Sequence, residues 1–280
     1  MRRLLIRPGA IGDCIVSLPA LESLRADYTE VWVASPNIPL VRFADRVRGI
    51  VSTGLDLMEI PGRTPPVALM DALGSFDSVV SWYGAGREAF RAAVRARQLP
   101  FRFFPALPHD ATCHAADFYL AQARTIEPRC LSAVPRIPCP RVDGGYVVIH
   151  PFSSSAAKSW PLERFREVAD GLPGGPPVEW CVGPEEELAG ARRFDDLYEL
   201  GRWLASASLY IGNDSGISHL AAAVGTPVVA VFGPSDPRVW APRGPVVEVV
   251  SPPTQAPIDN VATGRVLAAA VRLLDTSRAE

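Results

Sequence analysis

The feature that most constrains the fold of this chain is a pair of apolar runs separated by a short polar turn and a helical stretch. The runs are Leu209–Ile211 and Val228–Phe232, and the turn after the first one reads Gly-Asn-Asp-Ser-Gly from Gly212 to Gly216. Asn, Asp, Ser and Gly commonly begin helices, and His219–Val224 continues as a helical stretch. The pattern therefore predicts a strand, a tight turn, a helix and a second strand.

A helix that begins at such a turn leaves the backbone N–H groups of its first turn without partners inside the helix. Those groups and the positive end of the helix dipole attract an anion. We therefore expect a phosphate-bearing ligand to bind where this helix begins, at Ser215 and Gly216.

Composition places the chain among soluble globular proteins, because 48% of its 280 residues are hydrophobic and 21% are charged. No run of about 18 apolar residues is present, so we expect no membrane-spanning helix. A net charge of −2 does not fit a nucleic-acid-binding protein, which would be basic with a clustered patch. The five cysteines form no CxxC pair, which predicts reduced thiols in a cytoplasm and no zinc site.

The first half opens with an apolar strand at Leu4–Ile6, a turn that contains Gly9 and Gly12, and a helix. This order is typical of a doubly wound α/β domain. The third glycine of GxGxxG is missing, so the turn does not match a dinucleotide fingerprint. Asp13, at the helix start, has two interpretations: a carboxylate that caps the helix, or one that faces a ligand at the carboxyl end of the strand.

The α/β pattern then repeats. We expect strands near residues 31–34, 50–51, 79–82 and 101–104, and helices near 38–47, 88–96 and 115–123. Arg87, Arg91 and Arg95 share one helix face, which is either solvated or in contact with anionic lipid. Adjacent Cys113 and His114 point in different directions and suggest structural roles, with His114 also a candidate for touching an acceptor.

A proline-rich segment divides the chain. Residues 127–144 carry four prolines and end in glycine, and this density of proline disfavours both helix and central strand. We therefore predict a first domain at 1–135, a linker at 136–144 and a second domain at 145–280, whose last helix can pack back on the first domain.

The second half contains an unusual lysine. After a strand at Tyr146–Ile149, a serine-rich turn leads to Lys158, the only lysine among 28 basic residues. Lysine binds phosphate as a compact point charge, and Ser153, Ser154 and nearby amides could complete an anion nest. The alternative is a surface lysine without a special role.

Three glutamates follow the next strand, Val178–Val182. Glu185, Glu186 and Glu187 are expected at a helix start, where acids suit the dipole. One of the three could instead bind a ribose hydroxyl, as acids do in nucleotide sites.

Four motifs stand in order along the chain. They are Arg7–Asp13, His150-Pro151 with Lys158–Leu162, Gly212–Ala223, and Gly225–Pro237 with Trp240. Together they resemble the lipopolysaccharide heptosyltransferase family, glycosyltransferase family 9, over nearly the whole chain. The acceptor-side segment from Pro61 to Asp110 matches no motif of that family.

The resemblance implies a GT-B architecture, with two Rossmann-like α/β domains whose parallel sheets face a central cleft. It implies an inverting transfer of heptose from ADP-heptose to a glycolipid or saccharide acceptor of the lipopolysaccharide inner core. No metal and no cofactor are expected. The enzyme would be cytoplasmic and could touch the inner face of the membrane through its N-terminal domain, without nucleic acid as a partner.

The resemblance also assigns residues. Asp13 matches the catalytic base, and Lys158 matches the lysine on the donor diphosphate, with Ser153 and Ser154 beside it. On the donor side the matching residues are Asp214, Ser215, Gly216 and His219, with Glu185 for the ribose, although Glu186 and Glu187 leave the register open. On the acceptor side we place Gly9 and Gly12 of the first turn, together with His114 as the candidate named above.

The sequence leaves other functions open. A nucleotide-sugar-binding protein without turnover, or a transferase of the same fold with another donor and a different acceptor, would carry the same donor motif. An epimerase of this fold would need a second carboxylate, which the N-terminal half does not offer. A dehydrogenase is disfavoured because GxGxxG is missing.

Overall fold

The computed structural model describes residues 1–60, 62–108, 112–129, 132–142, 144–174, 176–253 and 256–278. The chain divides into two compact units, of which the first holds residues 1–110 and 115–133 and the second holds 111–114 and 134–280. The change at residues 133–134 lies beside the linker that the prolines predict. The proposed domain boundaries at 135 and 145 stay predictions.

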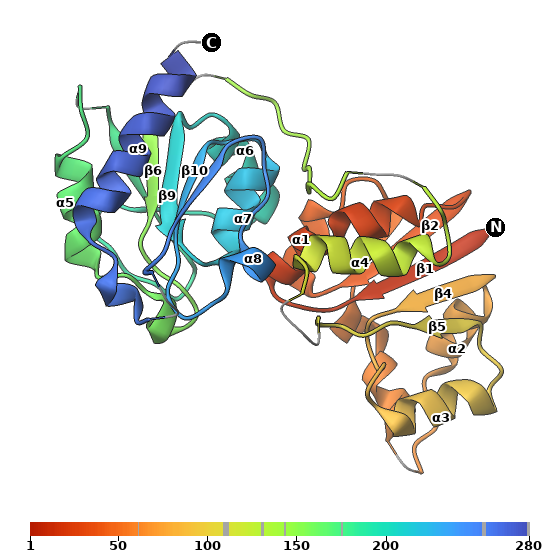
Figure 1. The fold of residues 1–280 in the computed structure, drawn as a ribbon. Coiled ribbons are helices and arrows are strands. Elements are labelled where there is room, and N and C mark those ends of the chain that lie inside the picture. Colours follow the sequence, from red (N-terminus) through yellow and green to blue (C-terminus); the bar gives the residue numbers. More distant parts are fainter. Residues whose placement is uncertain are drawn as a thin grey trace. The chain divides into compact units, whose positions relative to one another are not determined.

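The first unit is a parallel five-stranded sheet in the order β3-β2-β1-β4-β5 (Figure 1). Its strands are β1 (Arg2–Arg7), β2 (Tyr28–Val33), β3 (Arg46–Gly49), β4 (Ser78–Ser81) and β5 (Phe101–Phe103). Its helices are α1 (Ile11–Ser23), α2 (Val67–Gly74), α3 (Glu88–Ala96) and α4 (Ala115–Arg124), with short 3-10 helices η1 (Ser35–Leu40), η2 (Ile50–Thr53) and η3 (Leu55–Glu59).

Helices cover the first sheet on both faces (Figure 1). Leu4 and Ile6 of β1 pack in one cluster with Leu73 of α2 and Phe90 of α3. Leu5 lies between them in the strand and is equally buried. Successive side chains of a strand point to opposite faces, so an unbroken apolar run forms this central strand because neither face meets water.

The second unit repeats the plan with a parallel sheet in the order β11-β10-β9-β6-β7-β8. Its strands are β6 (Val147–His150), β7 (Val178–Val182), β8 (Arg192–Arg193), β9 (Leu209–Asn213), β10 (Val228–Val231) and β11 (Val247–Val250). Its helices are α5 (Leu162–Asp170), α6 (Leu197–Ala205), α7 (Gly216–Ala223), α8 (Pro237–Trp240) and α9 (Thr263–Arg278), with 3-10 helices η4 (Ala156–Lys158) and η5 (Ile258–Asn260).

Helices α5 and α9 pack on one face of the second sheet, and α6 and α7 lie on the other (Figure 1). Phe165 of α5 and Val266 of α9 share a buried cluster with Ile149 and Ile211 of the sheet. The last helix therefore buries its apolar side on its own unit. The expected α/β class, with two Rossmann-like domains built on parallel sheets, is confirmed.

Each sheet has one point where the strand order reverses. It lies between β1 and β4 in the first unit and between β6 and β9 in the second. Connections leave such a point in opposite directions, which opens a crevice at the carboxyl ends of the two strands, and ligands of α/β proteins bind there. Asp13 follows β1, Lys158 follows β6 and Asp214 follows β9, so all three lie at these edges.

Two sequence expectations in the first unit are wrong. Residues 38–47 form the end of η1 and the beginning of β3, and no α-helix. Pro39 falls inside that stretch and Pro36 lies just before it, and proline supplies no N–H for a regular helix. Ile50–Val51 is part of η2, because the strand ends at Gly49.

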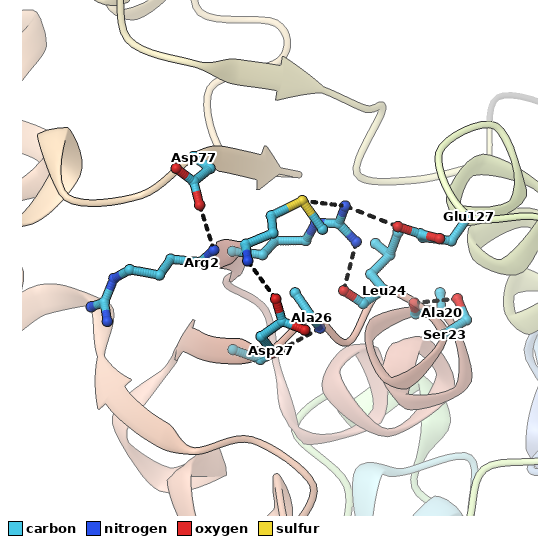
Figure 2. A network of polar contacts seen from close by, with 11 residues as sticks. Arg2, Ala20, Ser23, Leu24, Ala26, Asp27, Asp77 and Glu127 are labelled. Atoms are coloured by element: carbon cyan, nitrogen blue, oxygen red, sulfur yellow. Dashed lines mark hydrogen bonds and ion pairs between the residues drawn. The ribbon is translucent and has the colours of Figure 1, made fainter.

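At the amino end of β1, the opposite edge from Asp13, a polar network ties the strand to its surroundings (Figure 2). The Arg2 N–H donates to Asp77 Oδ2 at 2.6 Å. Arg3 is buried and donates to the Leu24 carbonyl at 2.8 Å and to Glu127 Oε1 at 3.1 Å. β1 is therefore fastened to the end of α1 and to the segments that precede β4 and follow α4.

Candidate functional site

The point where the strand order of the second sheet reverses, between β6 and β9, is called its switch point below, and the buried Asn213 makes hydrogen bonds across it. His150 and Asn213 are the last residues of β6 and β9. Asn213 Oδ1 accepts a hydrogen bond from the Trp160 N–H at 3.0 Å, and its Nδ2 donates to the Pro151 carbonyl at 2.8 Å. The Ser218 hydroxyl donates to the Asn213 carbonyl at 2.5 Å. These bonds fix the loop after β6 against the start of α7.

Lys158 and Asp214 form an ion pair at this switch point, with Nζ 2.7 Å from Oδ2. The Lys158 side chain is 36% exposed and that of Asp214 is 7% exposed, so the ammonium reaches solvent while the carboxylate lies below it. Ser215 is the N-cap residue of α7. The lysine and the helix N-terminus, which the sequence marks as separate anion-binding groups, are therefore brought to one place.

The other donor-side residues lie on the two segments that meet here. Ser153 and Ser154 are in the loop between β6 and η4, where Ser153 is half-buried and Ser154 is exposed. Gly216 begins α7, and His219 is buried near the start of the same helix. The structure thus gathers polar groups from a serine-rich loop and from a helix N-terminus, an arrangement suited to an anion.

Of the three glutamates, only Glu186 turns toward the switch point. The segment after β7 forms turns and no helix, so the expected helix start at residues 184–187 is wrong. Glu186 Oε2 accepts a hydrogen bond from the Gly183 N–H at 2.6 Å and lies 3.2 Å from His150 Nε2. Glu185 and Glu187 are exposed.

The surroundings of Glu186 favour its charged form. Burial raises the pKa of its carboxyl, but the contacts with His150 and the Gly183 N–H, together with the charge of Arg193, outweigh burial and hold the pKa below its ordinary value.

The sequence alone did not assign His150 or Asn213 to the site. The available signal was their place as polar residues at the ends of buried apolar strands.

Asp13 lies on the first turn of α1 in the first unit, at the carboxyl end of β1. Its Oδ2 accepts a hydrogen bond from the Ala10 N–H at 3.1 Å, which confirms the capping interpretation. Its Oδ1 lies 3.7 Å from Arg7 Nη2, and the side chain remains 29% exposed. Capping leaves a partly exposed carboxylate, so the second interpretation, a ligand-facing acid, is compatible with the same geometry.

Gly9 makes this turn possible. It adopts φ +146°, and a Cβ at this position would lie 2.7 Å from the Cβ of Asp13. Only glycine takes this conformation without strain. Asn37 Nδ2 donates to the Gly9 carbonyl at 3.0 Å, which ties the turn to η1. Gly12 lies in the first turn of α1.

A hollow of about 650 Å³ opens at the carboxyl ends of β4 and β5, within the first unit. It is lined by Trp82, Gly84, Ala85, Gly86 and residues 105–108. The Trp82 N–H donates to the Ile6 carbonyl at 3.0 Å, and β4 is the neighbour of β1. The hollow therefore lies one strand away from the Asp13 turn.

Two predicted contacts on the acceptor side have other partners. His114 is buried in the second unit, where its Nε2 lies 2.8 Å from the Ala241 carbonyl oxygen. In the arginine row of α3, Arg87 pairs with Glu59 at 2.7 Å, and Arg91 donates to the Ala85 carbonyl at 3.2 Å. Contact of these side chains with an acceptor or with lipid stays a prediction.

Within the described ranges, no group of three or more His, Cys, Asp or Glu side chains is placed to hold a metal ion. No helix there has both the length and the apolar character needed to cross a membrane. Cys14 follows Asp13, and burial raises the pKa of its thiol to about 12, so it is no nucleophile at neutral pH.

Comparison with known proteins identifies the family. Residues 113–267 match the family model described as glycosyltransferase family 9 (heptosyltransferase). The chain belongs to glycosyltransferase family 9. Lys158, Glu186 and Asp214–His219 lie inside the matched range of this family 9 chain, and Asp13 lies outside it.

One curated relative matches part of the chain in sequence. Lipopolysaccharide heptosyltransferase 3 of Escherichia coli (strain K12) is 36% identical over 117 residues, which are 35% of this chain and 33% of that protein. The match thus spans about a third of the relative's length.

The structure of E. coli ADP-heptose lps heptosyltransferase II superposes with a TM-score of 0.74 at 16% identity, covering 99% of this chain and 100% of the other. The E. coli heptosyltransferase WaaC with ADP gives a TM-score of 0.70 at 17% identity, with 98% and 100% covered. At these identities the structures show a shared fold.

The lowered pKa of Glu186 predicts a pH-dependent contribution to stability. The folded pKa is below the unfolded value of about 4.3, so the stabilisation is complete above that pH and is lost as the pH falls through the folded value. We expect Glu186→Gln to lower the melting temperature at pH 7, with a smaller difference from wild type at pH 4 and below. Thermal unfolding across this range measures the difference. The exposed neighbour provides a control, since Glu185→Gln should match wild type throughout, and an effect of Glu186→Gln that does not change with pH would contradict the assignment.

Proposed function

We propose that this family 9 chain transfers a heptose from ADP-heptose to a saccharide acceptor, which we place in the lipopolysaccharide inner core. Support comes from the family match, from the relative named lipopolysaccharide heptosyltransferase 3 and from the shared fold with WaaC, whose structure contains ADP. The observation that carries the proposal is the Lys158–Asp214 pair beside the N-terminus of α7, inside the matched segment.

The donor would bind the second unit with its diphosphate between Lys158 and the first turn of α7. Negative charge grows on the diphosphate oxygens as the bond to the sugar breaks, and preorganised positive groups at such oxygens are often the largest catalytic contribution. The ion pair with Asp214 keeps the ammonium in this place before the donor arrives. Ser153, Ser154 and the buried His219 would complete the polar surroundings.

We place an acid at the ribose of the donor. The sequence resemblance favours Glu185, and the geometry favours Glu186, because Glu186 alone of the three glutamates contacts a residue of the switch point. Nucleotide ribose in α/β proteins is bound by an acid that follows a neighbouring strand, and β7 is the neighbour of β6. His150 would then orient this acid from the end of β6.

Asp13 would act as the base that accepts the proton of the attacking acceptor hydroxyl, and the reaction would invert the anomeric configuration. Its partly exposed carboxylate can be reached by a ligand. The hollow at the ends of β4 and β5 would hold the acceptor near this turn, in line with the binding of ligands at carboxyl ends of parallel strands.

We also propose that transfer needs no metal, because Lys158 and the α7 N-terminus supply the positive charge that a metal would provide to a leaving diphosphate. We place the enzyme in the cytoplasm, where a nucleotide sugar is available, with the acceptor at the inner face of the membrane. The arginine row of α3 would face anionic lipid. The alternative function is that of a nucleotide-sugar-binding protein without turnover, which differs from a transferase in releasing no ADP when an acceptor is present.

Replacing the base should stop transfer and spare donor binding. We expect Asp13→Asn to lower the rate of heptose transfer by ~10²–10⁴-fold, the usual contribution of a general base. The amide keeps an oxygen for the Ala10 N–H, so the turn should survive. The measurement is ADP release from ADP-heptose with heptose-deficient lipopolysaccharide, together with calorimetry of ADP binding. Undiminished transfer would remove Asp13 from its role, and tight ADP binding without turnover in the wild type would favour the binding-protein alternative.

Loss of the lone lysine should weaken both binding of ADP and turnover. We expect Lys158→Met to lower kcat by ~10²–10³-fold, as removal of one oxyanion-stabilising group does. Lys158→Arg keeps the charge and should lose less. Melting temperatures are recorded for both variants, since Lys158→Met leaves Asp214 without this ion-pair partner. Wild-type affinity for ADP and wild-type kcat in Lys158→Met would be incompatible with the proposed diphosphate site, and thermal stabilisation by UDP-sugars alone would rule out ADP-heptose.

Removal of divalent cations should leave transfer intact. We expect protein treated with EDTA and assayed in its presence to keep the initial rate measured with Mg²⁺, because the diphosphate charge is met by protein groups. The assay is the same ADP release with lipopolysaccharide as acceptor. A rate that collapses in EDTA and returns with added Mg²⁺ or Fe²⁺ would overturn metal independence.

A further inference from the structure

A buried arginine, Arg7, lies next to the Asp13 carboxylate. Arg7 is the last residue of β1, and its side chain is only 3% exposed. Its Nη1 donates to the Pro8 carbonyl at 2.6 Å, and its Nη2 donates to the Tyr119 hydroxyl at 2.9 Å. The same Nη2 lies 3.7 Å from Asp13 Oδ1. The guanidinium is thus held by backbone and by a phenol while it faces the carboxylate.

Tyr119 of α4 is the fixed point of this arrangement. It is fully buried, and its hydroxyl donates to the Ala106 carbonyl at 2.8 Å. The Arg7 guanidinium carbon also lies 4.7 Å from the centre of the tyrosine ring, a distance at which a cation is attracted to an aromatic face. Burial raises the pKa of the Tyr119 phenol, so the hydroxyl keeps its proton and remains a donor at neutral pH.

Burial of a guanidinium is costly unless its charge is paired and its N–H groups are bonded. Among the residues that the structure describes, Asp13 provides the carboxylate within 4 Å of the Arg7 guanidinium. Gly9 closes the turn tightly over both side chains, since a Cβ at Gly9 would lie 3.2 Å from Arg7 Nη1. An apolar residue of similar volume would fill this space without the desolvation penalty of a buried charge. The retained guanidinium therefore indicates a functional role for its charge.

We propose that Arg7 is a positioning residue for Asp13 and that Tyr119 holds Arg7 in place. The inference rests on the proposed role of Asp13 as the base. Asp13 Oδ2 is bound by the Ala10 N–H and Oδ1 faces Arg7, so both oxygens have a fixed direction before an acceptor arrives. Positioning of this kind matters because a misplacement of about 1 Å can cost on the order of 10²-fold in rate.

The same bonds connect the base with the hollow at the ends of β4 and β5. Ala106, which accepts from Tyr119, is part of the wall of that hollow. The series Asp13, Arg7, Tyr119 and Ala106 therefore sets the distance between the carboxylate and the wall. Removal of a middle member should affect turnover and leave the donor residues of the second unit untouched.

The test compares two buried arginines of one strand. Arg7→Met should lower kcat by ~100-fold, with the Kd for ADP within two-fold of wild type. Arg3→Met is the control, because Arg3 is also buried in β1 but bonds to Leu24 and Glu127 at the other end; it should lower the melting temperature and keep kcat. Tyr119→Phe, which removes one hydroxyl, should lower kcat by about 3- to 10-fold, and Arg7→Lys should recover part of the rate lost in Arg7→Met.

A double variant separates positioning from general damage. If Arg7 acts through Asp13, Arg7→Met should cause no further loss of the residual rate when added to Asp13→Asn, because residues that act as one unit are not additive. If the fold-losses in rate of the two single variants multiply in the double variant, the inference is overturned. If Arg7→Met does not fold, Tyr119→Phe takes its place in the test, and a wild-type kcat in Tyr119→Phe overturns the inference. Full activity of Asp13→Asn would instead refute the proposed base, so the two failures are distinguishable.

Discussion

Parallel strand pairing is the constraint on which the rest of this structure depends. Because all strands of a parallel sheet run the same way, their carboxyl ends meet at one edge, and the helical connections leave that edge open only where the strand order reverses. Both units of the chain have one such point, between β1 and β4 and between β6 and β9. The polar residues that the sequence marks as chemically suggestive follow β1, β6 and β9, and the sheet alone brings the last two groups together.

Charged side chains at these edges have partners within the protein. The second unit pairs Lys158 with Asp214, and Glu186 lies 3.2 Å from His150 Nε2. The first unit sets Arg7 against Asp13. Each pair joins the end of one strand, or the loop after it, to a neighbouring segment. Paired groups avoid the penalty of an unpartnered buried charge, and they also give each side chain a fixed direction, which is what a site for a charged ligand requires.

The sequence predicted the central elements well because they carry the strongest physical signals. Unbroken apolar runs such as Leu209–Ile211 are buried on both faces, and the helix after Ser215 begins where its capping residues stand. β3 was missed because it is an edge strand with charged residues, Arg46 and Arg48, and it offers no apolar run. The helix expected at residues 38–47 does not form, because Pro39 supplies no N–H for regular helical hydrogen bonds and the chain makes only the end of η1 there.

Site residues were harder to predict than elements, since orientation depends on tertiary contacts. Three consecutive glutamates look alike in sequence, and only the turn after β7 selects Glu186 to face His150. His114 shows the same limit, because its contact with Ala241 joins positions 127 residues apart. The pairing of Lys158 with Asp214 could be suspected from two motifs, but its 2.7 Å geometry follows from the reversal of strand order.

The scarcity of lysine has a practical consequence for chemistry on this protein. Among the side chains of the chain, Lys158 is the sole primary amine, and it is about a third exposed at the edge of the second sheet. An amine-selective reagent therefore has one side-chain target, at the place where an anionic ligand would compete with it. Isotopic labelling of that nitrogen would give one side-chain signal, beside that of the α-amine of the chain, and binding at this edge would change it.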